Sequence, residues 1–156
     1  MKALVVYDSK FGNTELVAQE IADCLGGGGP VFCGDARETD LMGLDLLVVG
    51  GPTQGHGLSP DLRTFLDTLT AEQVRDLRFA TFDTRLTWPR FLAGSAAVQA
   101  AKRLTKLGAR MLVAPERFLV KESKGPLLDR ELSRAEEWAT QVGVAAGLIE
   151  AELSPV

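Results

Sequence analysis

Short apolar runs alternate along the chain with longer segments in which apolar residues recur every three or four positions. The short runs have the length of buried β-strands, and the longer segments have the period of amphipathic helices. Strands are expected at residues 3–7, 31–33, 44–49, 78–82 and 111–113, the last continued by 118–120 after a proline. Strands that alternate with helices predict an α/β fold with a parallel sheet and helices on both faces.

Helices are expected at residues 13–25, after Ser59, at residues 96–107 and near the C-terminus. Ser59 and Pro60 provide a capping serine and a proline at the first helical position. The last helix shows a continuous apolar stripe, formed by Leu132, Ala135, Ala139, Val142, Ala146 and Ile149. The glycine run at residues 26–29 ends the first helix, whereas a phosphate loop follows a strand and opens a helix, so we interpret the run as a helix C-cap and turn.

The composition fits one soluble domain over residues 1–156. Hydrophobic residues make up 46% of the chain and charged residues 24%, which excludes a disordered chain. No apolar run approaches the roughly 20 residues of a membrane span, and the start of the chain lacks the pattern of a secretory signal. The net charge of −4 argues against nucleic acid as a partner, since binding it requires a basic patch.

Cysteine and histidine are scarce, which bears on metal binding and on the redox compartment. Cys24 and Cys33 have neither a metal-ligand spacing nor the pattern of a disulfide framework, so we expect two free thiols in a cytoplasmic protein. His56 is the only histidine of the sequence, which excludes a multi-histidine metal site. We therefore expect no metal.

The segment after the first strand has the composition of a phosphate-binding loop. Ser9 and Thr14 provide hydroxyls, Asn13 provides an amide, and the backbone N–H groups of the loop converge at a helix N-terminus. Only Gly12 is present of the three glycines in a dinucleotide fingerprint, and the Walker pattern is absent, so a terminal phosphate monoester fits best. Taken alone, the segment is also compatible with an ordinary strand–helix turn rich in capping residues.

Three loops together carry a resemblance to a known family. The string YDSKFGNTE at residues 7–15 resembles the FMN phosphate loop of flavodoxins, whose pattern is S/T-x-x-G-N-T after the first strand. The string GGPTQGHG at residues 50–57 resembles the first flavin-edge loop of that family, and residues 83–95 take the place of the second. The resemblance covers essentially the whole chain. It implies a flavodoxin-like, doubly wound sheet of five parallel strands in the order 2-1-3-4-5.

The resemblance also implies non-covalent binding of FMN by named residues. The phosphate would be held by Ser9, Lys10, Phe11, Gly12, Asn13 and Thr14, with Phe11 acting through its backbone. The ring would be contacted by Pro52, Thr53, Gln54, Gly55, His56, Asp83, Thr84, Arg85 and Trp88. Gly55 would provide the peptide flip with which flavodoxins accept a hydrogen bond from the reduced ring, and so separate two one-electron steps.

Several of these residues depart from the flavodoxin pattern or allow two interpretations. Gln54 takes the place of a stacking aromatic, and Trp88 is either a flavin contact or a loop anchor packed on the core. Arg85 either raises the second reduction potential, because a cation favours the anionic reduced flavin, or it points to solvent or pairs with Asp83. His56 is either a proton donor beside the ring or, as we prefer, a ring-edge or solvent contact.

Two features of the helices also allow two interpretations. Trp138 lies next to the apolar stripe of the last helix and is expected to be a packed or half-exposed residue. A cationic set is either a docking site for an acidic partner or, by default, a solvated helix face; it consists of Lys102, Arg103, Lys106 and Arg110.

These observations favour a monomeric electron carrier that shuttles electrons between redox partner proteins through bound FMN. A chain this short has little material for a second substrate pocket. A small FMN-dependent NAD(P)H or quinone oxidoreductase is the alternative, favoured by the absent aromatic in the second loop and the lack of acidic character in the third. A flavodoxin-like module with weak or regulatory FMN binding is a further alternative.

Overall fold

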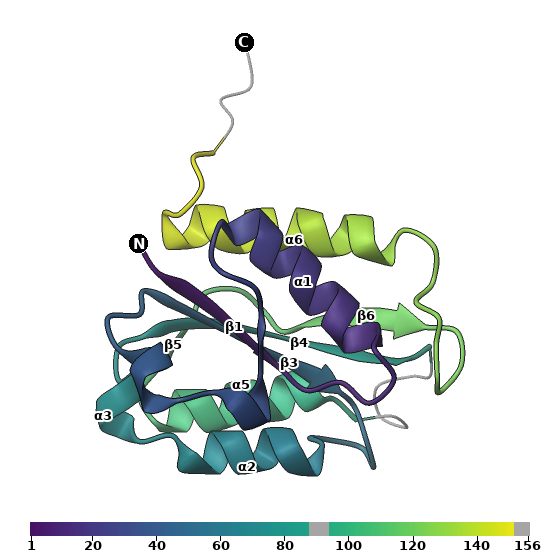
Figure 1. The fold of residues 1–156 in the computed structure, drawn as a ribbon, viewed down its shortest axis with the longest axis horizontal. Helices are drawn as coiled ribbons and strands as arrows, with labels where there is room; N and C mark the ends of the chain where they lie inside the picture. Colours follow the sequence, from purple (N-terminus) through teal and green to yellow (C-terminus); the bar gives the residue numbers. More distant parts are fainter. Residues whose placement is uncertain (88–93, 152–156) are drawn as a thin grey trace.

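Six parallel strands form one sheet in the computed structural model, which describes residues 1–87 and 94–151 (Figure 1). The sheet runs in the order β2-β1-β3-β4-β5, and β6 also pairs with β4. The strands are β1 (Ala3–Tyr7), β2 (Val31–Phe32), β3 (Leu46–Pro52), β4 (Arg78–Leu86), β5 (Arg110–Met111) and β6 (Glu116–Val120). The helices are α1 (Asn13–Leu25), α2 (Pro60–Thr68), α3 (Ala71–Val74), α5 (Ala96–Lys106) and α6 (Glu131–Ala146), with short 3₁₀ turns η1 (Cys33–Asp35) and η2 (Glu38–Leu41).

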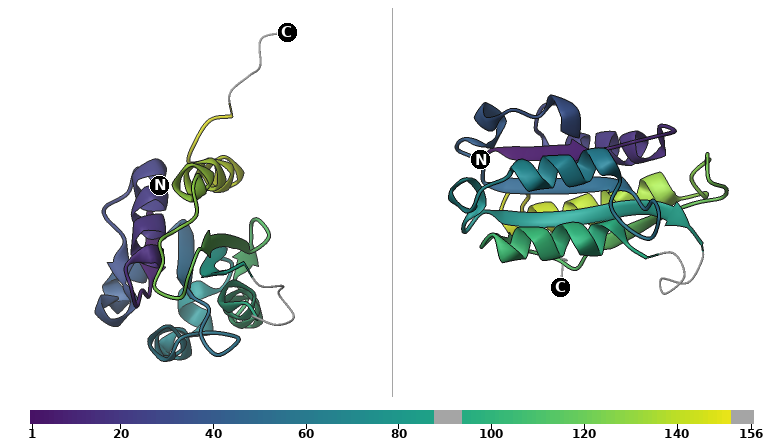
Figure 2. Two further views of the ribbon diagram at one scale, coloured as in Figure 1. Left: turned by 90° about the vertical axis from the view of Figure 1, so that its right-hand side faces the viewer. Right: turned by 90° about the horizontal axis from the view of Figure 1, so that it is seen from below.

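Helices cover both faces of the sheet, as the alternation of strands and helices predicts (Figure 1, Figure 2). α1 and α6 lie together on one face, and α2 and α5 lie on the other. Side chains alternate along each strand, so that Val6 and Val49 face the α2–α5 layer while Val5 and Val48 face the α1–α6 layer. Burial on both faces explains why these strands appear in the sequence as continuous apolar runs. None of the described helices is long and apolar enough to cross a membrane.

The predicted order 2-1-3-4-5 is confirmed, and the fifth strand is formed in two pieces. β5 pairs with the start of β4, at Arg78 and Phe79, and β6 pairs with its end, from Phe82 to Leu86. Pro115 lies between the two pieces, and a proline has no N–H to donate to a sheet ladder. The interruption therefore falls where the sequence cannot continue the hydrogen bonding.

Two central strands extend further toward their carboxyl ends than the sequence predicts. β3 begins at Leu46 rather than residue 44 and continues through two glycines to Pro52. β4 continues past Phe82 to Leu86, so the expectation that residues 83–85 belong to a loop is wrong. Polar residues can stay in this strand because β4 pairs with β3 on one side and β6 on the other. A central position, rather than an apolar sequence, keeps them in the sheet.

The cap expected for α2 forms only in part. Pro60 is the first helical residue, as predicted, but the Ser59 hydroxyl makes no capping bond. It instead donates to the Asp8 carboxylate, 2.5 Å away at the end of β1. Both side chains are buried, so this bond ties the start of α2 to the loop that follows β1.

The apolar stripe of α6 is confirmed at its centre and wrong at its ends. Ala135, Ala139, Val142 and Ala146 are buried, but Leu132 is 39% exposed and Ile149 lies beyond the end of the helix. Trp138 is buried, as the packing interpretation expects. Its indole packs edge-to-face against Phe82 at 6.0 Å and Phe118 at 6.1 Å between ring centroids, which joins α6 to the sheet.

Removing a ring from this aromatic cluster is expected to destabilise the fold. Phe118 is fully buried, so Phe118→Ala should lower the free energy of unfolding by about 3–5 kcal/mol in urea titrations. Leu132→Ala is the control, because its side chain is half exposed, and its effect should stay within about 0.5 kcal/mol. If the free energy of unfolding fell equally in the two variants, the assignment of the buried and exposed sides of α6 would be contradicted.

Candidate functional site

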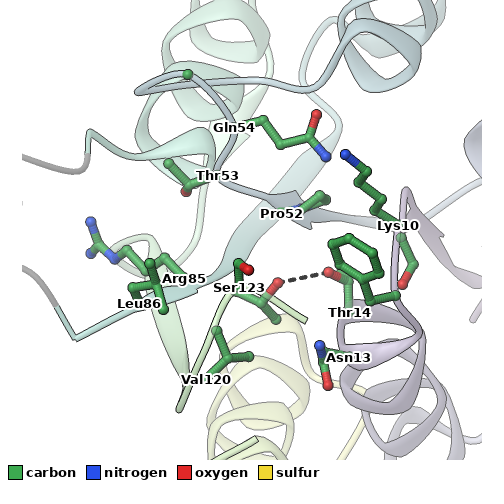
Figure 3. A pocket seen from close by; sticks show the side chains of 14 residues that line it. Lys10, Asn13, Thr14, Pro52, Thr53, Gln54, Arg85, Leu86, Val120 and Ser123 are labelled. Carbon is green, nitrogen blue, oxygen red and sulfur yellow. Dashed lines mark hydrogen bonds between the residues drawn. The ribbon is translucent and has the colours of Figure 1, made fainter. Parts of the chain in front are cut away.

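A cleft of about 340 Å³ opens at the edge of the sheet where the strands end (Figure 3). Its volume lies in the range of small-molecule sites, and the carboxyl ends of parallel strands are where open α/β sheets bind ligands. The lining residues come from the carboxyl ends of β3, β4 and β6 and from the segments that follow β1, β3 and β6; they are Ser9, Lys10, Phe11, Asn13, Thr14, Pro52, Thr53, Gln54, Gly55, Thr84, Arg85, Leu86, Val120 and Ser123.

The loop at residues 9–14 wraps around the N-terminus of α1. Gly12 has a φ of 90°, which glycine adopts readily, and its N–H donates to the Ser9 hydroxyl at 3.0 Å. The Thr14 and Thr84 hydroxyls are buried and lie 2.7 Å apart. Two hydroxyls carry two protons and use one between them, so the pair retains one O–H for a ligand.

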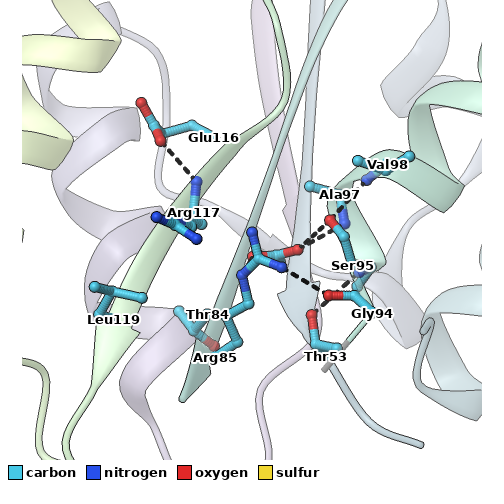
Figure 4. A network of polar contacts seen from close by, with 12 residues as sticks. Thr53, Thr84, Arg85, Gly94, Ser95, Ala97, Val98, Glu116, Arg117 and Leu119 are labelled. Atoms are coloured by element: carbon cyan, nitrogen blue, oxygen red, sulfur yellow. Dashed lines mark hydrogen bonds and ion pairs between the residues drawn. The ribbon is translucent and has the colours of Figure 1, made fainter. Parts of the chain in front are cut away.

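No side chain caps α1, whereas the start of α5 is fully occupied by protein groups (Figure 4). Ser95 caps α5 in the usual way. The Ala96 N–H donates to the Thr53 hydroxyl at 3.1 Å, and the Ala97 N–H donates to the buried Asp83 carboxylate at 3.1 Å. Of α1 and α5, only α1 therefore leaves its first-turn N–H groups to an acceptor from outside the protein. α2 and α6 also lack a side-chain cap, but no residue of their first turns lines the cleft.

A small anion at the start of α1 would satisfy these groups. It would meet the helix N-terminus, the Thr14–Thr84 hydroxyl pair and the Asn13 amide, without any arginine. A helix N-terminus attracts negative charge because its unpaired N–H dipoles point outward. The geometry thus favours phosphate binding over an ordinary capped strand–helix turn.

The second loop turns back on itself at the mouth of the cleft. Gln54 and Gly57 exchange backbone hydrogen bonds of 2.8 and 2.9 Å, which leaves Gly55 and His56 at the tip. Both tip residues have positive φ, 51° and 70°, as in a two-residue type I′ turn. The His56 ring is exposed, and its backbone carbonyl accepts a bond from the Gln99 side chain at 3.3 Å.

A buried polar pair joins Arg85, which lines the cleft, to Asp83 behind the cleft wall. Asp83 is fully buried, and its carboxylate accepts bonds from the Ser95 hydroxyl and the Ala97 N–H. The Arg85 Nε lies 3.6 Å from this carboxylate, and Arg85 Nη1 donates to the Gly94 carbonyl at 2.7 Å. Burial raises the pKa of the Asp83 carboxyl, an effect that the bonds from Ala97 and Ser95 and the charge of Arg85 oppose. Arg85 is therefore placed as expected for the interpretation in which it pairs with Asp83.

The cleft brings together most of the residues expected to hold a cofactor. Gly12, His56 and Asp83 do not line it: Gly12 shapes the first loop, His56 lies at the exposed tip of the second, and Asp83 lies behind the wall. The expectation for Trp88 falls outside the described residues.

Three lining residues were not expected from the sequence, namely Leu86, Val120 and Ser123. Leu86 was missed because β4 is longer than its apolar run. The other two had a usable signal, because a strand was expected to end at residue 120 and all parallel strands end at the same edge.

Comparisons with known proteins agree with this geometry. A family model described as Flavodoxin matches residues 5–138. Similar solved structures include an archaeal flavodoxin (TM-score 0.79, 19% identity, covering 94% of this chain and 99% of that one) and oxidised flavodoxin 1 from Bacillus cereus (0.70, 19%, 89% and 95%). A flavodoxin of Streptococcus pneumonia TIGR4 is also similar (0.72, 20%, 92% and 99%). At these identities the structural likeness shows the fold. Among curated proteins, none matches the chain by sequence.

The buried carboxyl of Asp83 should make stability depend on pH. Its pKa is raised above the ordinary 3.8, so its contribution to stability is fully present below that pH and is lost as the pH rises through the folded-state pKa. Asp83→Asn keeps an acceptor oxygen for Ser95 and Ala97 but cannot ionise. Its free energy of unfolding relative to the wild type should therefore increase as the pH rises above about 4.

Urea titrations at a series of pH values measure this difference. Asp61→Asn is the matched control, because it removes the same charge from an exposed position in the first turn of α2. A difference that stays flat for Asp83→Asn, or that has the same slope in the control, would contradict an effect of burial.

Proposed function

The chain belongs to the flavodoxin family, and on this premise we propose that it binds FMN in the cleft and carries single electrons between redox proteins. The observation that carries the proposal is the uncapped start of α1 beside an open cleft, opposite a fully capped α5. FMN supplies one- and two-electron redox chemistry when bound. The protein would hold the phosphate, orient the ring and exclude water from one side of the ring.

The phosphate would be bound by the loop at residues 9–14. Thr14 and Thr84 offer the hydroxyl proton that their mutual bond leaves over, and Asn13 offers an amide at the cleft wall. The first-turn N–H groups of α1 would complete the set. A phosphate monoester fits because these donors lie together at the start of α1, as at other helix N-termini that bind phosphate.

The ring would lie between the second loop and the ends of β4 and β6. Thr53 and Gln54 line one side, and Leu86 and Val120 offer apolar contact on the other. Gln54 lies where flavodoxins commonly have an aromatic residue. The apolar side chains on the β6 side, Leu86 and Val120, would therefore bury a larger share of the ring. The support for this placement is that all four side chains wall the same cleft as the phosphate loop (Figure 3).

Gly55 would supply the movable peptide beside the ring. Its φ is 51°, and a Cβ added there would meet no atom within 4 Å, so there is free space beside this residue. A glycine can change between conformations of positive and negative φ at little cost. A carbonyl that turns toward the ring after reduction would separate the two one-electron steps, which is what a carrier of single electrons needs.

Thr14→Val tests the phosphate site. Hydrogen bonds to a charged group contribute about 1.5–3 kcal/mol, so FMN affinity should fall by roughly 10- to 150-fold. Riboflavin, which lacks the phosphate, should bind to the variant and the wild type equally. Quenching of flavin fluorescence during titration of the apo-protein gives both dissociation constants.

Thr64→Val is the matched control for this experiment. It makes the same change on the exposed side of α2, where the hydroxyl bonds only to the Pro60 carbonyl. If riboflavin loses as much affinity as FMN in Thr14→Val, this threonine does not contact the phosphate.

Reduction of the FMN-loaded protein distinguishes a carrier from an enzyme. A carrier should be reduced photochemically in two separate one-electron steps, and should oxidise neither NADH nor NADPH without a reductase. Anaerobic absorbance spectra follow both reactions. Rapid bleaching of the flavin by either nucleotide would support the NAD(P)H or quinone oxidoreductase instead, and a failure to bind FMN would overturn the proposal.

A further inference from the structure

An exposed aromatic flanked by two lysines lies beside the phosphate loop. The Phe11 side chain is 45% exposed, although large apolar side chains are mostly buried in this fold. The Nζ atoms of Lys10 and Lys124 lie 5.3 and 5.9 Å from the centre of its ring. Both ammonium groups are within cation–π distance, so they hold positive charge close to the ring.

The segment that carries Lys124 is fixed against α1. The Asn13 side chain donates to the Lys124 carbonyl at 3.2 Å. Gly125, next in the chain, has a φ of 100°, and a Cβ there would lie 2.5 Å from the Asn13 side-chain oxygen. Ser123, on the other side of Lys124, lines the cleft. The lysine is thus placed at the rim of the cleft by close backbone packing.

Positive charge predominates at this rim although the chain as a whole is acidic. Within residues 9–12 and 121–124, Lys10, Lys121 and Lys124 are exposed against one exposed acid, Glu122, while the net charge of the chain is −4. The next exposed acids along these two segments are Glu15 and Asp129.

We propose that Lys10, Phe11, Lys121 and Lys124, here called the lysine rim, form the docking surface for a redox protein with an acidic surface. The inference rests on the proposed function. An acidic surface would be steered to the lysines, and the exposed Phe11 ring close to Lys10 and Lys124 offers the apolar anchor on which interfaces concentrate binding energy. Charge complementarity at short range decides how two docking proteins are oriented. The net charge of −4 does not favour one orientation of the partner over another.

The test follows electron transfer from the reduced, FMN-loaded protein to two acceptors by stopped flow. One acceptor is an acidic cytochrome b5 and the other is a basic cytochrome c. Ionic strength is varied from about 0.01 M, where the Debye length is about 30 Å, to about 1 M, where it is about 3 Å. The rate constant with the acidic acceptor should fall by at least about tenfold over this range, and that with the basic acceptor should not fall.

Charge reversal locates the effect. Lys121→Glu with Lys124→Glu should invert the salt dependence for the two acceptors. Lys102→Glu with Lys106→Glu makes the same change in net charge on exposed side chains toward the C-terminal end of α5, away from the cleft, and should leave the dependence as in the wild type. The dissociation constant for FMN is measured for every variant.

Each contrary result has a distinct meaning. A wild type that prefers the basic acceptor at low salt, or a control pair that acts like the rim pair, would show that net charge rather than the rim selects partners, and would overturn the inference. An unchanged salt dependence with weaker FMN binding in the rim pair would show that these lysines serve the cofactor only. A chain that binds no FMN would refute the proposed function instead.

Discussion

Backbone N–H groups at the start of a helix need acceptors, and at one edge of this sheet two helices meet that need in opposite ways. α5 is closed by Ser95, Thr53 and Asp83, all of them protein groups. α1 begins at a glycine and has no side-chain cap. The site depends on this difference, because Thr53, one of the acceptors that close α5, also lines the cleft. Capping one helix shapes the pocket into which the other opens.

The length of β4 is what connects the two helix starts. Thr84 lies in register with Pro52 on β3 and with Phe118 on β6, so its hydroxyl reaches Thr14 across the sheet. Asp83, one residue earlier, points to the other face and reaches α5. Two adjacent residues of one strand therefore serve helices on opposite faces. A shift of one residue in this register would exchange their roles and remove both contacts.

Most of the fold could be predicted from the sequence, because burial on both faces leaves apolar runs that periodicity detects. The first strand and the first helix are confirmed at their predicted bounds, and Gly26, in the left-handed conformation, ends the helix. The carboxyl ends of β3 and β4 could not be predicted in the same way. Their last residues are glycine, proline or buried polar residues, which are held by neighbouring strands and by α5 rather than by their own propensity.

The candidate site follows the same division. Residues of the first two loops could be placed from their motifs, because a phosphate loop and a glycine-rich turn need particular residue types at fixed spacing. Leu86, Val120 and Ser123 have no such motif, and they reach the cleft only through the order of strands in the sheet. The prediction that Leu132 belongs to the buried stripe of α6 is wrong for a related reason. The helical period identifies an apolar stripe, but only packing decides where the layer that covers it ends.

The pair formed by Asp83 and Arg85 limits how strongly the protein can act on charge in the cleft. Arg85 lines the cleft, and its Nε lies 3.6 Å from the Asp83 carboxylate, so part of its field is cancelled. The carboxylate is not devoted to that partner, because its other oxygen accepts from Ser95 and from the first turn of α5. The helix N-terminus offsets part of the negative charge as well. The field left at the cleft wall is therefore positive but weaker than that of an isolated arginine, so Arg85 would favour electron uptake by a bound group less than the sequence alone suggests.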